Sequence, residues 1–496
     1  MKFRLVLRVL AFISLVVSIC MVFPMIWSAI DAGADFGAFV LSLLCGVGVS
    51  FALFTLGGGK IGEIFFERRK EYEELGIREA FAVVGLSWVI AAAVGALPYV
   101  LAGCLPSYTD AFFETVSGFT TTGATVITDV EAVPRGLLFW RGMTHWLGGM
   151  GIIVLSLAVL PFLGVGGMEL YKAEVPGPTP EKLTPRVQQT ALCLWGVYVF
   201  LTALETAFLM FGGMDLFESL IHAFSTISTG GFSTRNASVA AYGSAYIEWV
   251  ITFFMVASGV NFALHFLFLT GFCGKALRDE EFRFYAGICL FSTAVVAAML
   301  WGGAYLSGLE HAVRGAAFQV ASFITTTGFV SENYNLWPRF ARSILMLLAF
   351  VGGCAGSTGG GLKVVRVLLL LRCIGLEIQM LLHPRSVPHT RVNGTVVSSR
   401  ALSAVLAFFT LYVAILVVAT LAALATGQGK LDMVTAVFGA VVTLSNVGPG
   451  LGHLGAVENY AWLPDAVKWI FSLCMLAGRL ELYPILLLLY PPTWTR

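Results

Sequence analysis

The sequence repeats one short pattern four times, each copy lying between two apolar stretches long enough to cross a bilayer. The first copy, residues 110–125, reads Asp-Ala-Phe-Phe-Glu-Thr-Val-Ser-Gly-Phe-Thr-Thr-Thr-Gly-Ala-Thr; it begins like a helix and ends in hydroxyl residues and a glycine. The other copies cover about 215–232, 311–329 and 432–449. Each is too short to cross a membrane alone. The pattern therefore predicts a re-entrant segment, in which a half-helix enters the membrane and an extended backbone leaves it.

The composition requires a membrane around these segments. Of 496 residues, 58% are apolar and 12% are charged, whereas a soluble domain has about 25% charged residues. We expect ten spanning helices and four re-entrant loops. The predicted fold class is an all-α polytopic membrane protein: two N-terminal transmembrane helices, then four span–pore helix–span repeats in a pseudo-fourfold arrangement within the lipid bilayer.

The expected boundaries follow the repeats. Residues 1–78 hold the two N-terminal helices and a connector, and the four pore repeats cover 79–185, 186–278, 279–395 and 396–496. Lysine and arginine are more frequent in the loops on the side of the N-terminus, for example in Arg68-Arg69-Lys70. The positive-inside rule then places both termini in the cytoplasm, so the re-entrant loops enter from outside.

Other classes of site are not indicated. No basic run interleaved with aromatic residues suggests a nucleic-acid partner. The nine cysteines are scattered and never form a Cys-x-x-Cys pair, so neither a disulfide framework nor a zinc site follows. His145, His222 and His265 lack metal-ligand spacing, and we expect them to pack or to form hydrogen bonds.

The ends of the four copies carry the candidate cation ligands. A half-helix that enters from outside points its partly negative C-terminal end at the membrane centre, and exposed carbonyls there can replace the water around a cation. Glycine lets the backbone adopt angles that side chains forbid. The candidate filter residues are Thr121, Thr122, Gly123, Thr229, Gly230, Gly231, Thr326, Thr327, Gly328, Asn446, Val447 and Gly448.

A glycine in every copy leaves no side chain to narrow the ring, which favours K⁺ as the transported ion, with no covalently bound cofactor. In the second copy Gly231 is preferred to Gly230, because Gly231-Phe232 aligns with Gly328-Phe329; Gly230 remains open. Ordinary turns or helix-packing faces are the alternative to a filter.

A second irregularity lies at residues 352–363, which we call the glycine loop. Six of its first ten residues are glycine, and each costs a helix about 1 kcal/mol relative to alanine. The span at about 342–372 should therefore break just below the filter, leaving a loop that can act as a gate; flexible packing without gating is the alternative. The candidate gate residues are Gly356, Ser357, Thr358, Gly359, Gly360, Gly361, Lys363 and Arg479.

Arg479 lies inside the last apolar span, where an arginine is costly and needs a partner. The expected partners are carbonyls of the glycine loop or the hydroxyls of Ser357 or Thr358, and the expected role is to hold that loop. Snorkelling to the cytoplasmic face is the alternative. Lys363 and Arg366 are expected to face a cytoplasmic vestibule.

Several strings together resemble the TrkH/TrkG branch of the Trk/Ktr/HKT superfamily of potassium transporters. They are Ser-Gly-Phe-Thr-Thr-Thr-Gly-Ala-Thr at 117–125, Ser-Thr-Gly-Gly-Phe-Ser-Thr at 228–234, the glycine loop, and Gly-Arg-Leu-Glu-Leu-Tyr-Pro at 478–484. The resemblance covers the whole chain. It implies a homodimer in a bacterial inner membrane, with a cytosolic nucleotide-binding ring of the TrkA type as gating partner.

Three functions fit these features to different degrees. A channel-like potassium uptake pore, gated by the glycine loop, is preferred. A symporter coupled to protons or sodium would favour more membrane-embedded carboxylates than the sequence offers. An intramembrane enzyme would need a nucleophile or metal set, and no such set is found, so we expect no enzymatic activity.

Overall fold

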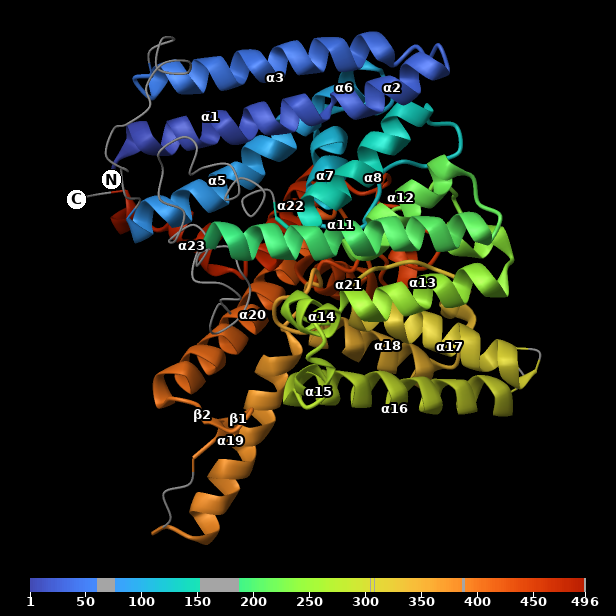
Figure 1. The fold of residues 1–496 in the computed structure, drawn as a ribbon, viewed down its shortest axis with the longest axis vertical. Helices are drawn as coiled ribbons and strands as arrows, with labels where there is room; N and C mark the ends of the chain where they lie inside the picture. The colour runs from blue at the N-terminus through green and yellow to red at the C-terminus, as the bar shows by residue number, and fades with distance from the viewer. Residues whose placement is uncertain (60–75, 152–186, 304, 307, 386–388, 495–496) are drawn as a thin grey trace.

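The structure is a computed structural model that describes all of the chain except residues 60–75, 152–186, 304, 307, 386–388 and 495–496. The described part is mostly helical, as predicted, with many long helices running side by side (Figure 1). It contains one small antiparallel hairpin, in which β1 (Arg391–Val392) pairs with β2 (Thr395–Val396). The basic cluster expected in the connector lies outside the described residues.

The N-terminal helices form two apolar spans, which confirms that prediction. Helices α1 (Phe3–Cys20) and α2 (Val22–Ile30) make one span, and α3 (Phe36–Leu56) returns beside α1. The ring of Phe3 stacks on that of Trp494, with 6.1 Å between centroids. The beginning and the end of the described chain therefore lie at the same end of the molecule.

After these helices, one order of elements occurs four times: a long helix, a short helix, a loop and a second helix that breaks or ends early. Repeat one contains α5 (Ile77–Gly95), α6 (Leu97–Leu101), α7 (Tyr108–Phe119) and α8 (Arg135–Gly149). Repeat two contains α11 (Val187–Phe211), α12 (Leu216–Ile227), η2 (Ser238–Tyr242), α13 (Ala245–Ser258), α14 (Phe262–Leu269) and α15 (Cys273–Ala276). Repeat three contains α16 (Glu280–Gly302), α17 (Leu309–Ile324), η3 (Tyr334–Leu336), α18 (Arg339–Val351) and α19 (Val364–Leu382). Repeat four contains α20 (Ser399–Thr426), α21 (Met433–Leu444), η4 (Gly452–Leu454), α22 (Asp465–Arg479), α23 (Tyr483–Leu489) and η5 (Pro491–Thr493).

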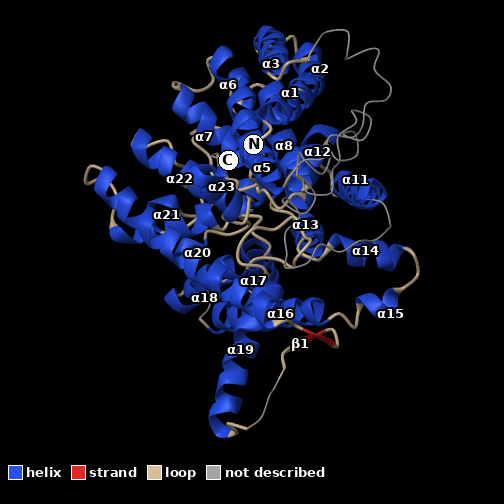
Figure 2. Cartoon of the chain, turned by 90° about the vertical axis from the view of Figure 1, so that its left-hand side faces the viewer, coloured by secondary structure: helices blue, strands red, loops and turns tan. Residues whose placement is uncertain are grey.

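The four short helices are largely buried, whereas the long helices α16 and α20 lie on the outside of the molecule. In α7 every residue from Asp110 to Phe119 is buried, whereas α16 and α20 expose apolar side chains such as Phe291 (72%) and Val418 (66%). Such outward apolar surface suits lipid. The loops that follow the short helices gather near the middle of the molecule, surrounded by helices (Figure 2).

Six described helices are long and apolar enough to cross a membrane, or seven if one bent pair counts as a span; ten spans were expected. The difference lies in the second helices. Helices α13 and α14 meet at an angle of 103°, α18 and α19 are separated by the glycine loop, and α22 and α23 by residues 480–482. Helix α8 ends at Gly149, and its expected continuation to 162 lies outside the described residues. One such break was predicted from the sequence.

Candidate functional site

The four short helices end in the same way. In each, the residue after the C-cap is left-handed, with φ of 53° at Thr121, 56° at Thr229, 59° at Thr326 and 57° at Asn446. The next residue donates its N–H to the carbonyl five residues earlier, as in Thr122 to Ser117 (2.9 Å), Gly230 to Ser225 (2.7 Å), Thr327 to Ser322 (2.8 Å) and Val447 to Val442 (2.8 Å). This is the Schellman ending of a helix, but with threonine or asparagine at the position where glycine is usual. A left-handed non-glycine residue costs about 1–2 kcal/mol, so the same strain is retained four times.

The repeated backbone fixes the alignment of the four loops. Two residues after each left-handed residue comes a glycine with positive φ: Gly123 (80°), Gly231 (82°), Gly328 (79°) and Gly448 (91°). We call these four the ring glycines. Gly231 is thus the geometric equivalent of Gly123, as preferred from the sequence, and Gly230 corresponds to Thr122, Thr327 and Val447.

The ring glycines lie next to one another in closed cyclic order. A Cβ atom on Gly123 would overlap the carbonyl oxygen of Gly230, and one on Gly231 would overlap that of Thr327. A Cβ on Gly328 would overlap the carbonyl oxygen of Val447, and one on Gly448 would overlap that of Thr122, which returns to the first loop. Each glycine is therefore required by the close approach of the next loop, and the four loops surround a common axis.

The four carbonyl oxygens that the ring glycines approach can serve as ligands of an ion. Thr122, Gly230, Thr327 and Val447 are buried, and within the described chain none of their carbonyl oxygens accepts a hydrogen bond. Buried carbonyls without a donor are uncommon in folded proteins. Four of them in one ring form a site that a dehydrated cation can occupy, and no side chain is needed as a ligand.

A cavity of about 110 Å³ opens onto the ring. All four ring glycines line it, together with polar residues of the loops that follow, such as Thr125, Asn236 and Asn459. Because it is lined from all four repeats, it provides a route to the ring.

A buried ion pair and its hydrogen bonds hold the loops that carry the ring glycines. Glu114 of α7 pairs with Arg141 of α8 (2.7 Å, both side chains almost fully buried) and accepts the N–H of Val126 (2.9 Å). Arg141 also donates to the carbonyl of Ser233 (2.9 Å) and lies over the ring of Phe232. These contacts tie the loop of repeat one to that of repeat two.

Two tyrosines hold the loop of repeat four, since the hydroxyls of Tyr460 and Tyr334 donate to the carbonyls of Gly448 (2.6 Å) and Gly450 (2.9 Å). The sequence prediction missed Arg141 and both tyrosines. Arg141 carries the same signal as Arg479, an arginine within an apolar helix; the tyrosines carry none.

The histidines pack and form hydrogen bonds, as expected. His145 stacks on Phe232 with ring centroids 4.0 Å apart. His222 approaches the hydroxyl of Ser233 (3.0 Å), and His265 the carbonyl of Ala257 (2.8 Å).

The glycine loop lies against the inner ends of three short helices. The hydroxyl of Thr358 donates to the carbonyl of Ile227, the last residue of α12 (3.0 Å). The N–H of Gly360 donates to the hydroxyl of Thr326 (2.7 Å), and a Cβ on Gly360 would overlap the carbonyl oxygen of Ser445. The break in the helix therefore occurs where it was predicted, directly beside the ring.

Arg479 donates to the carbonyl of Thr358 (2.6 Å), one of the loop carbonyls expected from the sequence. It also donates to the carbonyls of Gly148 and Gly149 (both 2.6 Å) at the end of α8, which were not expected. Glu481 pairs instead with Arg366.

The expected vestibule positions of Lys363 and Arg366 are wrong, because both side chains are buried (3% and 7% exposed). Lys363 donates to the carbonyl of Gly359 within the loop. Burial is possible because each cation has a partner, whereas an unpaired charge would remain in water.

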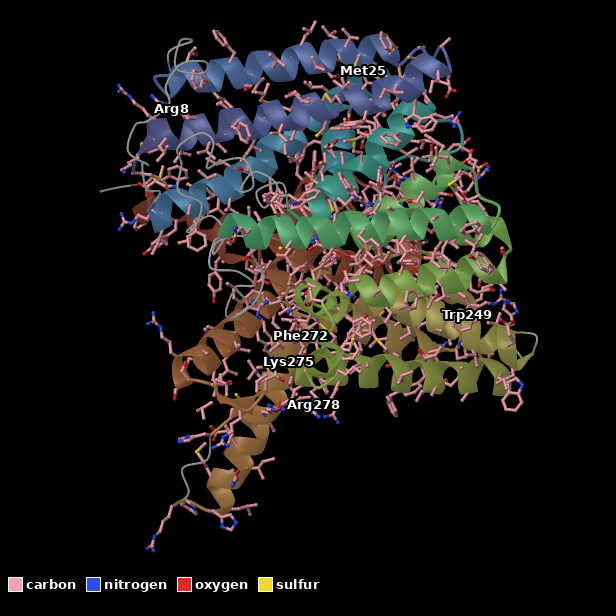
Figure 3. All side chains as sticks on the ribbon, viewed as in Figure 1. Arg8, Met25, Trp249, Phe272, Lys275 and Arg278 are labelled. Carbon is pink, nitrogen blue, oxygen red and sulfur yellow. The ribbon has the colours of Figure 1, made fainter. Side chains whose placement is uncertain are left out.

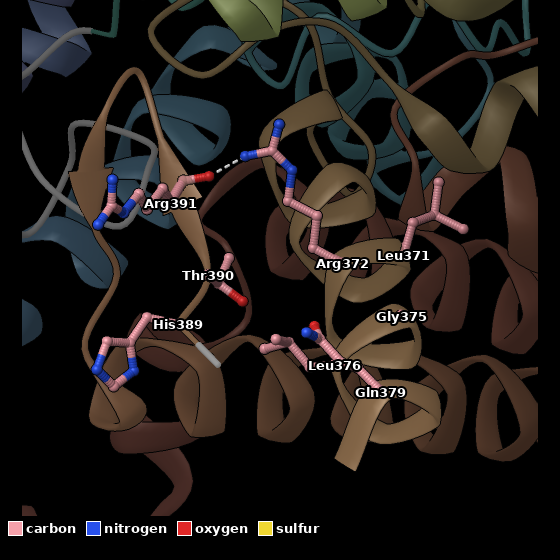
Figure 4. Close-up of a pocket in the computed structure, with 8 residues that line it drawn as sticks. All are labelled: Leu371, Arg372, Gly375, Leu376, Gln379, His389, Thr390 and Arg391. Atoms are coloured by element: carbon pink, nitrogen blue, oxygen red, sulfur yellow. Dashed lines mark hydrogen bonds between the residues drawn. The ribbon is translucent and has the colours of Figure 1, made fainter. Parts of the chain in front are cut away.

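A larger cavity, about 550 Å³, lies elsewhere, between α19 and the segment that leads into β1 (Figure 4). Leu371, Leu376, Gln379 and His389 are among its lining residues. None of the ring glycines or glycine-loop residues lines it, so it is not part of the route described above.

Comparison with known proteins assigns the chain to a family. The model of the family described as "TrkH: Cation transport protein" matches residues 60–492. The chain is 40% identical over 498 residues to the Trk system potassium uptake protein TrkH of Escherichia coli (strain K12), covering all of both chains. It is 35% identical over 445 residues to TrkG of the same organism, covering 89% of this chain and 90% of that one. The crystal structure of the potassium transporter TrkH from Vibrio parahaemolyticus superposes with a TM-score of 0.87 at 35% identity, covering all of both chains. The chain belongs to the TrkH family of cation transport proteins.

Proposed function

We propose that this protein takes up potassium through a channel-like pore whose selectivity filter is the ring of Gly123, Gly231, Gly328 and Gly448. The observation that carries the proposal is the closed cyclic contact of these four glycines with the carbonyls of Thr122, Gly230, Thr327 and Val447. Carbonyl oxygens that replace the hydration shell are how potassium filters select their ion. The relatives are named potassium uptake proteins, which are transporters and not enzymes.

Each short helix acts as a pore helix in this proposal. Its C-terminal end carries a partial negative charge of about half an electron, and the four ends point toward the ring. Together they offset part of the cost of a dehydrated cation. The hydroxyls of Thr122 and Thr327 bond to those of Thr120 (2.8 Å) and Thr325 (2.7 Å), and we assign the contacts with the ion to the backbone carbonyls.

The glycine loop is the gate. It contacts the inner ends of α12, α17 and α21, which is where an ion leaving the filter must pass. Gly356, Ser357, Thr358, Gly359, Gly360 and Gly361 form its blocking part, and Lys363 and Arg479 hold it. Removing residues 356–360 should raise ion flux.

The proposed location is a bacterial inner membrane, with both termini cytoplasmic. Arg8 lies near the N-terminus and Trp249 lies toward the opposite side of the molecule, with Lys275 and Arg278 between them (Figure 3). Lysine and arginine are more frequent in the loops on the side of the N-terminus, so this is the basic end that the positive-inside rule assigns to the cytoplasm. From the family resemblance, the protein works as a homodimer with a cytosolic nucleotide-binding ring of the TrkA type at that basic end. The relatives' names describe uptake and give no support to the symporter alternative.

Flux into proteoliposomes tests the proposal. Purified protein should load ⁸⁶Rb⁺, and external K⁺ should compete with it far better than equal Na⁺. Gly123→Ser should abolish that discrimination, because its side chain would meet the carbonyl of Gly230. Gly103→Ser is the matched control, since Gly103 also has positive φ (66°) but faces open space. Equal competition by Na⁺ in the unmodified protein would end the proposal.

A further inference from the structure

The first turn of α16 is held in place by contacts that do not involve the glycine loop. Asp279 caps the helix by accepting the N–H of Phe282 (2.8 Å), and it also accepts the side-chain amide of Asn393 in the hairpin (2.7 Å). Glu280 pairs with Arg372 of α19 (2.6 Å), and Arg372 in turn donates to the carbonyl of Arg391 (Figure 4). This turn is therefore a fixed support beside the cytoplasmic hairpin.

Glu281 projects from this support to the glycine loop. One of its carboxylate oxygens, Oε1, accepts the N–H of Ala355 (2.7 Å) and the N–H of Val365 (3.0 Å). These two donors lie on either side of the stretch from Gly356 to Gly361. Glu281 itself is 8% exposed, so water does not compete strongly for the two bonds.

No backbone bond between Ala355 and Val365 is present in the described chain. The nearest backbone link across the loop joins the N–H of Val364 to the carbonyl of Gly353 (3.0 Å). The carboxylate of Glu281 therefore closes the base of the loop, in the way that a strand pair closes a hairpin. Without it, the buried N–H of Val365 and the half-buried N–H of Ala355 would lose this partner, which is costly.

We propose that Glu281 is a positioning residue for the gate: its carboxylate ties the two ends of the glycine loop together and keeps the loop against the pore helices. This inference rests on the proposed gating role of that loop. It adds a second support to Arg479, at other residues of the loop and from a different repeat.

The test uses the full-length chain in proteoliposomes and compares three variants by ⁸⁶Rb⁺ flux per reconstituted protein. Glu281→Ala removes both bonds and should raise the ratio of open to closed protein about tenfold, the factor that corresponds to about 1.4 kcal/mol. Glu281→Gln keeps an oxygen that can accept both N–H groups and should retain most of the gating. Glu310→Ala is the matched control, because its 65% exposed side chain pairs with Arg314 of the same helix (3.2 Å) and takes no part in the support of Glu281; its flux should stay near wild type.

A chain that lacks residues 356–360 separates this inference from the function it rests on. If this deletion raises flux and Glu281→Ala does not, the positioning role is wrong and the gate stands. If the deletion leaves flux unchanged, the gate itself is wrong. In the deleted chain, Glu281→Ala should have no additional effect, since the two changes act on the same element. An equal change in both backgrounds would mean that Glu281 acts on overall structure, which overturns the proposal.

Discussion

Two kinds of glycine-rich, non-helical backbone pass through the middle of this protein, and they are held in different ways. The four loops that carry the ring glycines are fixed by hydrogen bonds within their own helix ends, such as Thr122 to Ser117. They are also fixed by the contact of each ring glycine with the next loop. The glycine loop is held by side chains from other elements, chiefly Arg479 and Glu281, and by backbone bonds to the break between α13 and α14, as in Cys354 to Gly259 (2.8 Å) and Phe262 to Gly356 (3.0 Å). The first arrangement is local and repeated; the second is remote and occurs once.

The way each segment is held indicates whether the ring loops or the glycine loop can move. Bonds that belong to a helix end are lost only when that helix end unfolds, so the ring should keep one geometry. Side chains that reach a loop from separate helices can be withdrawn while the helices stay intact, which is how an ordered segment is released in many switches. We therefore expect a rigid filter above a movable gate, and the variants below test that contrast.

The largest effect is expected at a ring glycine. Gly328→Ala adds a Cβ that overlaps the carbonyl of Val447 at φ of 79°, so strain of about 1–3 kcal/mol is joined by a backbone clash. Rb⁺ flux should fall at least about 100-fold. Gly213→Ala is the control, because Gly213 has φ of 95° but open space around it. Equal loss in both variants would mean that strain alone matters and that no ring contact is involved.

The second-largest effect is expected at the buried ion pair of Glu114 and Arg141, which supports the ring. Glu114→Ala leaves Arg141 as a buried cation without its carboxylate, which costs about 3–5 kcal/mol. The melting temperature in detergent should drop, and K⁺ over Na⁺ discrimination should weaken. Glu218→Ala breaks a more exposed pair with Arg235, with side-chain exposures of 16% and 42%, and should change both little. A stable and selective Glu114→Ala protein would show that the ring does not depend on this pair.

A variant that loosens the proposed gate should raise ion flux, whereas the ring variant above lowers it. Arg479→Ala removes the donor to the carbonyls of Thr358, Gly148 and Gly149, so the glycine loop loses its place and Rb⁺ flux should rise about tenfold. Discrimination between K⁺ and Na⁺ should be unchanged, because the ring is intact. Wild-type flux in this variant would mean that Arg479 does not hold the gate; altered discrimination would mean that gate and filter are not separate.

The smallest effect is expected at the contact between the glycine loop and the loop that carries Gly328. Thr326→Val removes the hydroxyl that accepts the N–H of Gly360, a bond worth about 1 kcal/mol, so flux should rise about fivefold. Thr326→Ser keeps the hydroxyl and should behave like the unmodified protein in the same flux assay. A Thr326→Ser variant that opens as much as Thr326→Val would assign the effect to packing.

The shape of the four loops that carry the ring glycines was predictable because its sequence signal is local. A short amphipathic helix, a hydroxyl run and a glycine lie within a few residues of one another, and the pattern occurs four times, as at Thr121-Thr122-Gly123 and Thr326-Thr327-Gly328. The break at residues 352–361 was predictable for the same reason, since six glycines in ten residues exclude a helix.

The breaks in the other second helices could not be predicted. One glycine, Gly259, precedes the bend between α13 and α14, and a single glycine is ordinary in membrane helices. Helix α22 ends at Arg479, where Glu481 and Leu482 adopt positive φ without any glycine. Pairs such as Lys468 with Asp110 join residues 358 positions apart. Their formation depends on the packed fold, which local patterns do not encode.

The central claim is that the ring binds a dehydrated ion through backbone carbonyls. Anomalous diffraction from crystals grown with Rb⁺ tests it most directly. We expect an Rb⁺ peak on the axis of the ring, coordinated by the carbonyl oxygens of Thr122, Gly230, Thr327 and Val447. An empty ring, with Rb⁺ bound instead by side-chain oxygens elsewhere in the protein, would contradict it.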